Sequence, residues 1–152
     1  MGWVRVDFHV HTVASRDATI CKGQIGYLLR RRVGVVAILD HNTTSMATRA
    51  KKVWGNRIIV GEEIDTGEGE VAGLFLREEI PSQLGLEMTI RLIKQQGGVV
   101  YVPHPFDSRR PSITVKGFGK FDWSDIDIIE VLNSRSRPHF NEKATILSLI
   151  HI

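Results

Sequence analysis

The chain has 152 residues, of which 42% are hydrophobic and 24% are charged, so it is long enough to bury one hydrophobic core. Its net charge of +3 suits an anionic substrate but is too small to indicate nucleic-acid binding by itself. A single cysteine excludes an intramolecular disulfide, and the sequence shows neither a secretion signal nor an apolar run that could cross a membrane. We therefore expect one cytoplasmic domain, residues 1–152, with no membrane association.

Predicted strands and helices alternate along the chain, which is typical of an α/β fold with a largely parallel sheet. The pattern predicts strands at residues 3–9, 34–39, 57–61, 70–76, 99–103 and 126–132. It predicts helices at residues 24–32, 44–54, 82–96 and 141–152. Ser82 is the expected N-cap of the third helix, and the acidic, glycine-rich residues 65–69 predict a hairpin.

Two histidines lie at the end of the first predicted strand. His9 and His11 are two residues apart, so both side chains point to the same side of that strand. A neutral imidazole is the commonest metal ligand in proteins, and a preceding carboxylate such as Asp7 can fix its tautomer. The alternative is an ordinary polar edge strand that happens to carry histidines.

Polar side chains also follow the other predicted strands, at the point where each strand ends. These are Asp40 and His41, Glu62 and Glu63, His104, and Asn133. In parallel α/β folds the carboxyl ends of the strands converge on one face and form the active site. The separate motifs therefore predict one cluster of His, Asp and Glu, which is a ligand set for Zn²⁺, Mn²⁺ or Fe²⁺.

Taken in chain order, these segments resemble the motifs of the PHP (polymerase and histidinol phosphatase) family. The matching segments are residues 7–12, 37–42, 61–64, 102–105 and 129–133. The resemblance covers nearly the whole chain and implies a distorted (βα)7-type barrel. It also implies two or three divalent metal ions (Mn, Zn or Fe) and hydrolysis of phosphoesters.

The resemblance further implies six metal ligands: His9, His11, Asp17, His41, Glu63 and His104. In that scheme His9 and His11 hold the first metal, Glu63 bridges the first and second, and His104 binds the second. Asp17 and His41 hold the third. Asp40, His41 and Glu63 form the implied catalytic group, with Asp40 orienting a neighbouring imidazole.

The chain departs from the family pattern in two places. Many relatives carry a histidine where this chain has Glu70, and Glu70 either ligates in its place or leaves a weaker site. The family also ends with a motif that supplies an Asp and a His to the metals, and no Asp follows Asn133 here. We therefore expect a barrel that lacks its final strands, either part of a longer product or a form completed by another chain, with a homo-oligomer as one outcome.

Arginines follow two of the predicted strands and are candidates for binding phosphate. Arg109 and Arg110 come after His104, and Arg135 comes after Asn133. A guanidinium group donates two hydrogen bonds to phosphate, whereas an arginine in a loop is more often simply solvated. The run at residues 30–32 ends a predicted helix, where cations favour the negative end of the helix dipole and face solvent.

The sequence thus predicts a divalent-metal-dependent phosphoesterase that acts on a small phosphorylated or nucleotide-type substrate through a metal-bound hydroxide. One alternative is a catalytically impaired module of the same fold that binds RNA or a protein, so a nucleic-acid partner stays open. Another is an enzyme that hydrolyses C–N bonds. The retained histidines favour an enzyme, and the loop arginines favour a phosphorylated substrate.

Overall fold

A computed structural model of the chain describes residues 2–113 and 123–151, without the side chains of Ile150 and His151. The strands are β1 (Val6–Val10), β2 (Val35–Ile38), β3 (Ile58–Asp65), β4 (Glu70–Leu74), β5 (Val99–Val102) and β6 (Ile128–Ile129). The helices are α1 (Lys22–Arg31), α2 (Ser45–Trp54), α3 (Leu86–Gln95) and α5 (Pro138–His151). The predicted end of the last helix, Ile152, lies outside the described residues.

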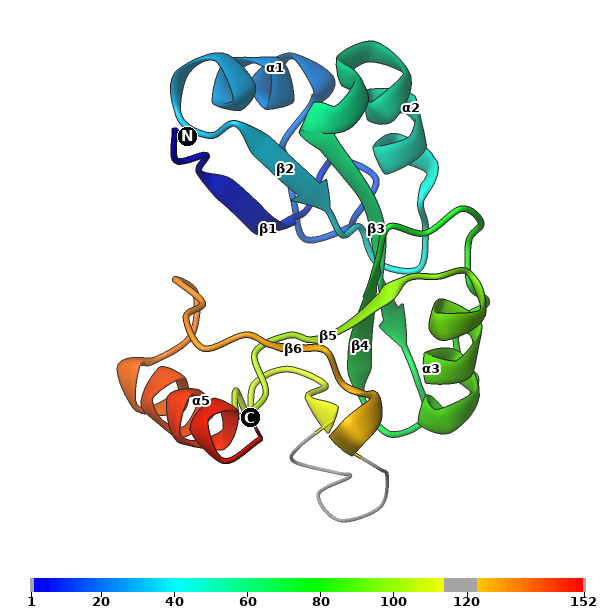
Figure 1. Cartoon of the computed structure of the whole chain (residues 1–152), viewed down its shortest axis with the longest axis vertical. Coiled ribbons are helices and arrows are strands. Elements are labelled where there is room, and N and C mark those ends of the chain that lie inside the picture. Colours follow the sequence, from blue (N-terminus) through cyan, green and yellow to red (C-terminus); the bar gives the residue numbers. More distant parts are fainter. Residues whose placement is uncertain (1, 114–122, 152) are drawn as a thin grey trace.

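The strands of the described residues form one sheet in the order β1-β2-β3-β4-β5-β6, and the sheet curls into a partial barrel (Figure 1). Strands β1, β2 and β3 run parallel, and so do β5 and β6, whereas β4 is antiparallel to both of its neighbours. The first half of β3 pairs with β2 and the second half pairs with β4. This long strand therefore joins the two halves of the sheet.

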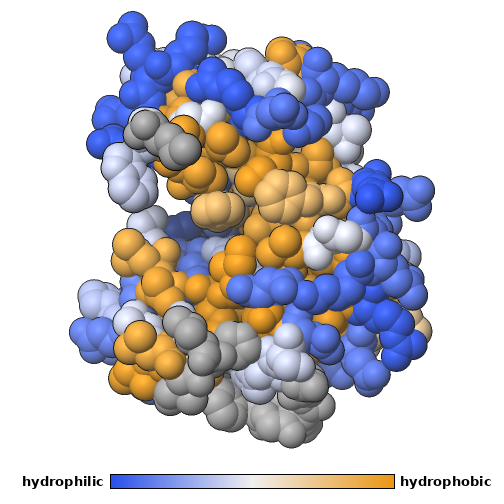
Figure 2. Space-filling view, viewed as in Figure 1, coloured by the Kyte–Doolittle hydropathy of each residue, from blue (hydrophilic) through white to orange (hydrophobic). Residues whose placement is uncertain are grey.

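The core is built from continuous apolar strands, as expected for strands covered on both faces. Ile38 and Ile58 pack with helices α1 and α2 in one cluster, and Ile64 and Val100 pack with α3 in another. Glycines allow the sheet to pack closely at β3, because a Cβ on Gly61 would lie 2.7 Å from the carbonyl oxygen of Gly73. Figure 2 shows the hydrophobic residues across the middle of one face of the molecule.

The α/β class, the hairpin at residues 65–69 and the partial barrel are as the sequence predicts, but several boundaries differ, among them the starts of β1 at Val6 and of α5 at Pro138. The strand predicted at residues 126–132 is hydrogen-bonded as a strand only at Ile128–Ile129. The third helix begins at Leu86 rather than after Ser82, and its N-cap is Gly85. The reason is a contact from outside the helix, because Glu68 in the hairpin turn accepts the backbone N–H of Leu86 at 2.9 Å.

Within the part of the chain that is described, no helix is long and apolar enough to cross a lipid bilayer.

The carboxylate of Glu68 supplies a capping interaction that α3 lacks locally. Replacing Glu68 with alanine should lower the free energy of unfolding by about 1 kcal/mol, as the loss of a cap does. Urea denaturation measures the change, and Glu78→Ala is the matched control because that side chain is exposed. Equal midpoints for the two variants would show that Glu68 does not stabilise the helix.

Candidate metal centre

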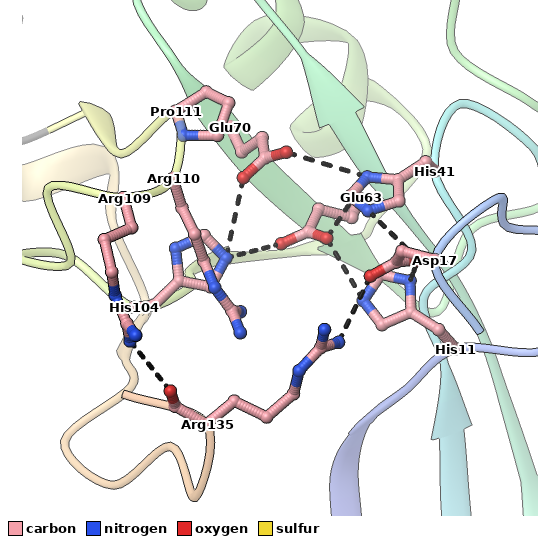
Figure 3. Close-up of a pocket in the computed structure, with 10 residues that line it drawn as sticks. All are labelled: His11, Asp17, His41, Glu63, Glu70, His104, Arg109, Arg110, Pro111 and Arg135. Carbon is pink, nitrogen blue, oxygen red and sulfur yellow. Dashed lines mark hydrogen bonds and ion pairs between the residues drawn. The ribbon is translucent and has the colours of Figure 1, made fainter. Parts of the chain in front are cut away.

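The carboxyl ends of the strands open into a cavity of about 410 Å³ (Figure 3). Ten residues line it: His11, Asp17, His41, Glu63, Glu70, His104, Arg109, Arg110, Pro111 and Arg135. Nearly all carry nitrogen or oxygen groups, and they come from segments far apart in the sequence. The cavity is therefore a polar site created by the fold.

His9 in β1 and His11, which directly follows that strand, meet at one point, as the spacing predicts. The Nε2 atoms of His9 and His11 are only 2.9 Å apart, and both rings are almost buried. The other nitrogen of each ring is held from behind. The Nδ1 atom of His9 lies 3.0 Å from Glu130 Oε1, and that of His11 lies 3.1 Å from Ser15 Oγ. These contacts fix both rings with Nε2 turned toward Glu63.

Glu63 is the carboxylate at the centre of the cluster, and its side chain is 1% exposed. Its oxygens lie 3.1 Å from His104 Nε2, 3.2 Å from His11 Nε2 and 3.4 Å from His41 Nδ1. Burial alone would raise the pKa of this carboxyl group, but the surrounding imidazoles hold it well below its usual range. The carboxylate is therefore kept ionised in a site almost closed to water.

Glu130 is a second anionic partner of His9, and its importance was not predicted from the sequence. Its carboxylate contacts His9 and accepts the backbone N–H of His104 at 2.6 Å. Burial alone would lower the pKa of His9, but Glu130 and Glu63 raise it to about 10. Burial alone would raise the pKa of Glu130, but His9 lowers it to about 2. The only sequence signal was a glutamate between the apolar residues Ile129 and Val131.

His104 reaches the cluster through an unusual backbone conformation. Its φ of 29° lies in the left-handed region of backbone conformation, which residues other than glycine rarely adopt. The hydrogen bond from its N–H to Glu130 holds this conformation. Strained residues of this kind concentrate at functional sites. Among the described residues, its buried Nδ1 atom has no hydrogen-bond partner.

A further group of donors surrounds His41 at the end of β2. Its Nε2 atom lies 3.7 Å from Asp17, and its Nδ1 atom lies 3.7 Å from Glu70. Burial together with the charges of Glu63 and Asp65 raises the pKa of Glu70 to about 8. Glu70 lines the cavity and contacts His41, and Asp65 belongs to the same group of donor atoms as these two residues. Asp65 was not predicted as a site residue.

Glu62 and Glu63 lie on opposite faces of β3, because adjacent side chains of a strand alternate. Glu62 is fully buried, accepts the backbone N–H of Ile80 at 2.9 Å and does not line the cavity. Burial raises its pKa to about 7. Of the two glutamates, only Glu63 faces the histidines.

The two aspartates that precede histidines make different contacts. Asp40 accepts hydrogen bonds from the backbone N–H and hydroxyl of Thr12 and from the hydroxyl of Ser15, and it does not line the cavity. Asp40 therefore reaches the ring of His11 through the hydroxyl of Ser15. Asp7 accepts the backbone N–H of His9 rather than holding an imidazole.

The three candidate arginines line the cavity, but they differ in how far their charges are already paired. Arg109 donates two hydrogen bonds to the buried carboxylate of Asp107. Arg135 reaches across the cavity to Asp17, at 3.2 Å. Arg110 is the least constrained, because its closest carboxylate contact is 3.8 Å, to Asp107. Figure 3 shows the guanidinium group of Arg110 directed into the open cavity.

The donor set fits divalent metal ions. The donor atoms form three groups, and within each group they all lie within 4.8 Å of one another. The groups are His9, Glu63 and His104; His11, Asp17 and His41; and His41, Asp65 and Glu70. Ligand atoms about 2.0–2.2 Å from one ion lie roughly 3.0–3.5 Å apart, which is close to the separations found around Glu63. Two imidazole nitrogens that face each other at 2.9 Å also require a proton or a cation between them. The structure brings together all six residues predicted as ligands.

The fold has a close counterpart among solved structures. The chain superimposes on the crystal structure of a candidate metal-dependent phosphoesterase from Bifidobacterium adolescentis with a TM-score of 0.65. The match covers 96% of this chain and 83% of the other, at 16% sequence identity, and therefore establishes a shared fold. This chain and that protein therefore share a fold, and in this chain the partial barrel carries clusters of histidine and glutamate side chains.

Two uncharacterized proteins of Methanocaldococcus jannaschii are similar in sequence. MJ1587 is 36% identical over 148 residues, which cover 88% of this chain and 84% of that protein. MJ0417 is 37% identical over 141 residues, and this chain spans about half of its length (54%). No protein-family model matches the chain. The chain belongs to the same family as MJ1587.

The two adjacent glutamates of β3 allow a matched test of the metal centre. Glu63→Gln should weaken binding of Mn²⁺ or Zn²⁺ by about 100-fold or more, because it removes the anionic ligand shared by the imidazoles. Glu62→Gln should bind as the unsubstituted protein does, because Glu62 faces the other side of the strand. Isothermal titration calorimetry on chelator-treated protein measures both. Equal affinities for the two variants would contradict this assignment.

Proposed function

We propose that the protein is a divalent-metal-dependent phosphoesterase that hydrolyses a small phosphorylated or nucleotide-type substrate. The observation that carries the proposal is the position of Glu63. It lies among four imidazoles at one wall of a cavity, and arginines form another wall. Anionic and imidazole ligands beside guanidinium groups suit a substrate that has to contact both metal ions and cationic side chains.

The side chains divide into those that would hold metal ions and those that would hold the substrate. The first group is His9, His11, Asp17, His41, Glu63 and His104, with Glu70 and Asp65 beside them. Two or three divalent ions bound there would lower the pKa of a water molecule and neutralise charge on the phosphate. Glu130 and Ser15 would keep the imidazoles of β1 in the orientation that ligation requires.

Arg110 is the best-placed group for the substrate phosphate. It lies on the loop after β5, and its guanidinium group is directed into the open cavity. Phosphoryl transfer develops negative charge on the equatorial oxygens, and a guanidinium group stabilises that charge through two parallel hydrogen bonds. Arg135 would join it on release from Asp17, whereas Arg109 is paired with Asp107 and supports the loop.

The first test of the proposal is metal dependence. The protein should hydrolyse p-nitrophenyl phosphate, bis(p-nitrophenyl) phosphate or a nucleotide only with a divalent ion, and exhaustive chelation should abolish the activity until Mn²⁺ is restored. Release of p-nitrophenol or inorganic phosphate measures the rate. A rate that chelation leaves unchanged would exclude this mechanism. Metal binding without any hydrolysis would instead favour the non-catalytic module of the same fold.

The second test concerns the substrate side of the cavity. Arg110→Ala should raise KM by about 10-fold to 150-fold, which corresponds to one charge-assisted hydrogen bond of about 1.5–3 kcal/mol. Arg77→Ala is a suitable control because Arg77 is exposed and does not line the cavity. Unchanged kinetics in Arg110→Ala would assign that arginine to the solvated surface.

A further inference from the structure

We propose that the chain carries a second anion-binding surface, separate from the metal centre, that binds single-stranded nucleic acid. It is an open hollow of about 420 Å³ beside the amino ends of β1 and β2. We call it the arginine hollow and define it by Trp3, Arg5, Arg30, Arg31, Arg32 and Arg57. The proposal does not depend on the proposed phosphoesterase activity, because the hollow shares no residue with the metal centre.

The arginine hollow collects positive charge without compensation. Five arginines line it, and no aspartate or glutamate does. Among the described residues, no carboxylate lies within 4.0 Å of any of these five guanidinium groups, whereas Arg109, Arg110 and Arg135 at the other end of the sheet all have such a partner. Like charges that line one hollow repel one another, and a bound polyanion removes that cost.

The helix dipole does not account for the cluster. The carboxyl end of α1 attracts a cation, but Arg57 already occupies that position. Its Nε donates to the carbonyl oxygen of Gly34 at 2.9 Å, and its Nη2 donates to that of Leu29. The charges of Arg5, Arg31 and Arg32 are therefore additional to what the helix end requires.

The charge of the chain is divided unevenly between its two parts. Residues 1–60 contain ten lysines and arginines but only three acidic residues: Asp7, Asp17 and Asp40. Asp17 and Asp40 are engaged at the opposite end of the strands, by Arg135 and by Thr12 and Ser15. Figure 2 shows hydrophilic residues gathered at the end of the molecule where α1 and α2 lie. The modest net charge of the whole chain therefore conceals a strongly basic end.

Two features favour an unpaired nucleic-acid strand over an anionic membrane. The cations of the hollow are all arginines, whose planar groups bind phosphate through two hydrogen bonds and also stack on bases. Trp3 is fully exposed beside them, and an exposed aromatic ring is a stacking platform for a base. An arginine groove with an aromatic side chain is the arrangement that binds single strands without sequence preference.

Fluorescence anisotropy with a labelled 12-nucleotide oligo(dT) or oligo(U), recorded over a range of NaCl in EDTA, tests the proposal. We expect the oligonucleotide to bind more weakly as NaCl increases. For each phosphate contact, the logarithm of the association constant should fall by about 0.7 for every tenfold rise in salt. The triple variant R30Q/R31Q/R32Q should lower both the affinity and this salt slope. Its matched control is R77Q/R91Q/K143Q, which has the same net charge but changes exposed cations outside the hollow.

Trp3 gives an independent measurement that does not alter charge. Trp3→Ala should weaken oligonucleotide binding by about 5-fold or more, and Trp3→Phe should retain most of it, because a phenyl ring still stacks. Metal-dependent hydrolysis of p-nitrophenyl phosphate should be unchanged in all of these variants, so failure of the phosphoesterase proposal would be seen separately.

Three results would overturn the inference. One is an equal loss of affinity in the two triple variants, which would mean attraction by net charge alone. Another is binding to phosphatidylserine vesicles with none to oligonucleotides, which would assign the hollow to a membrane. The third is a failure to bind the oligonucleotide measurably at low salt, in a protein sample that circular dichroism shows to be folded.

Discussion

The burial of one carboxylate, that of Glu63, determines how the rest of the site is arranged. An ionised carboxylate taken out of water is unstable unless charges and hydrogen bonds replace the lost hydration. Glu63 lies in the long strand that joins both halves of the sheet, so its partners have to come from both sides. They come from β1, from the end of β2 and from the end of β5. The histidines converge because each meets the same buried anion.

A second layer of contacts holds those histidines in place. Glu130 contacts the ring of His9 and the backbone of His104, and Ser15 contacts the ring of His11 and the backbone of His41. Asp40 in turn holds Ser15. Each supporting group thus serves two histidines from different segments. A change in either group would move more than one donor atom, because packed and hydrogen-bonded supports do not deform independently.

The sequence was most informative where a single physical rule decides the outcome. The spacing of His9 and His11, and the position of His41, Glu63 and His104 after apolar runs, follow from strand alternation and from the convergence of strand ends. Supporting contacts between distant segments could not be predicted in the same way. Glu130 meets His9 across 121 residues of sequence, and Glu68 caps a helix 18 residues away. Local patterns carry no information about such partners, which is also why the third helix was expected to begin at Ser82.

The metal centre also bears on how the partial barrel holds together. Strands β1 and β6 are the two ends of the sheet order, and no described backbone hydrogen bond joins them. Side chains do join them, since His9 meets Glu130 and Asp17 meets Arg135 across that open side. Metal ions bound to His9 and Asp17 would strengthen the same connection, because a ligand that binds only the folded state stabilises it. Metal binding and closure of the open side would therefore be coupled, because the same side chains, those of His9 and Asp17, take part in both.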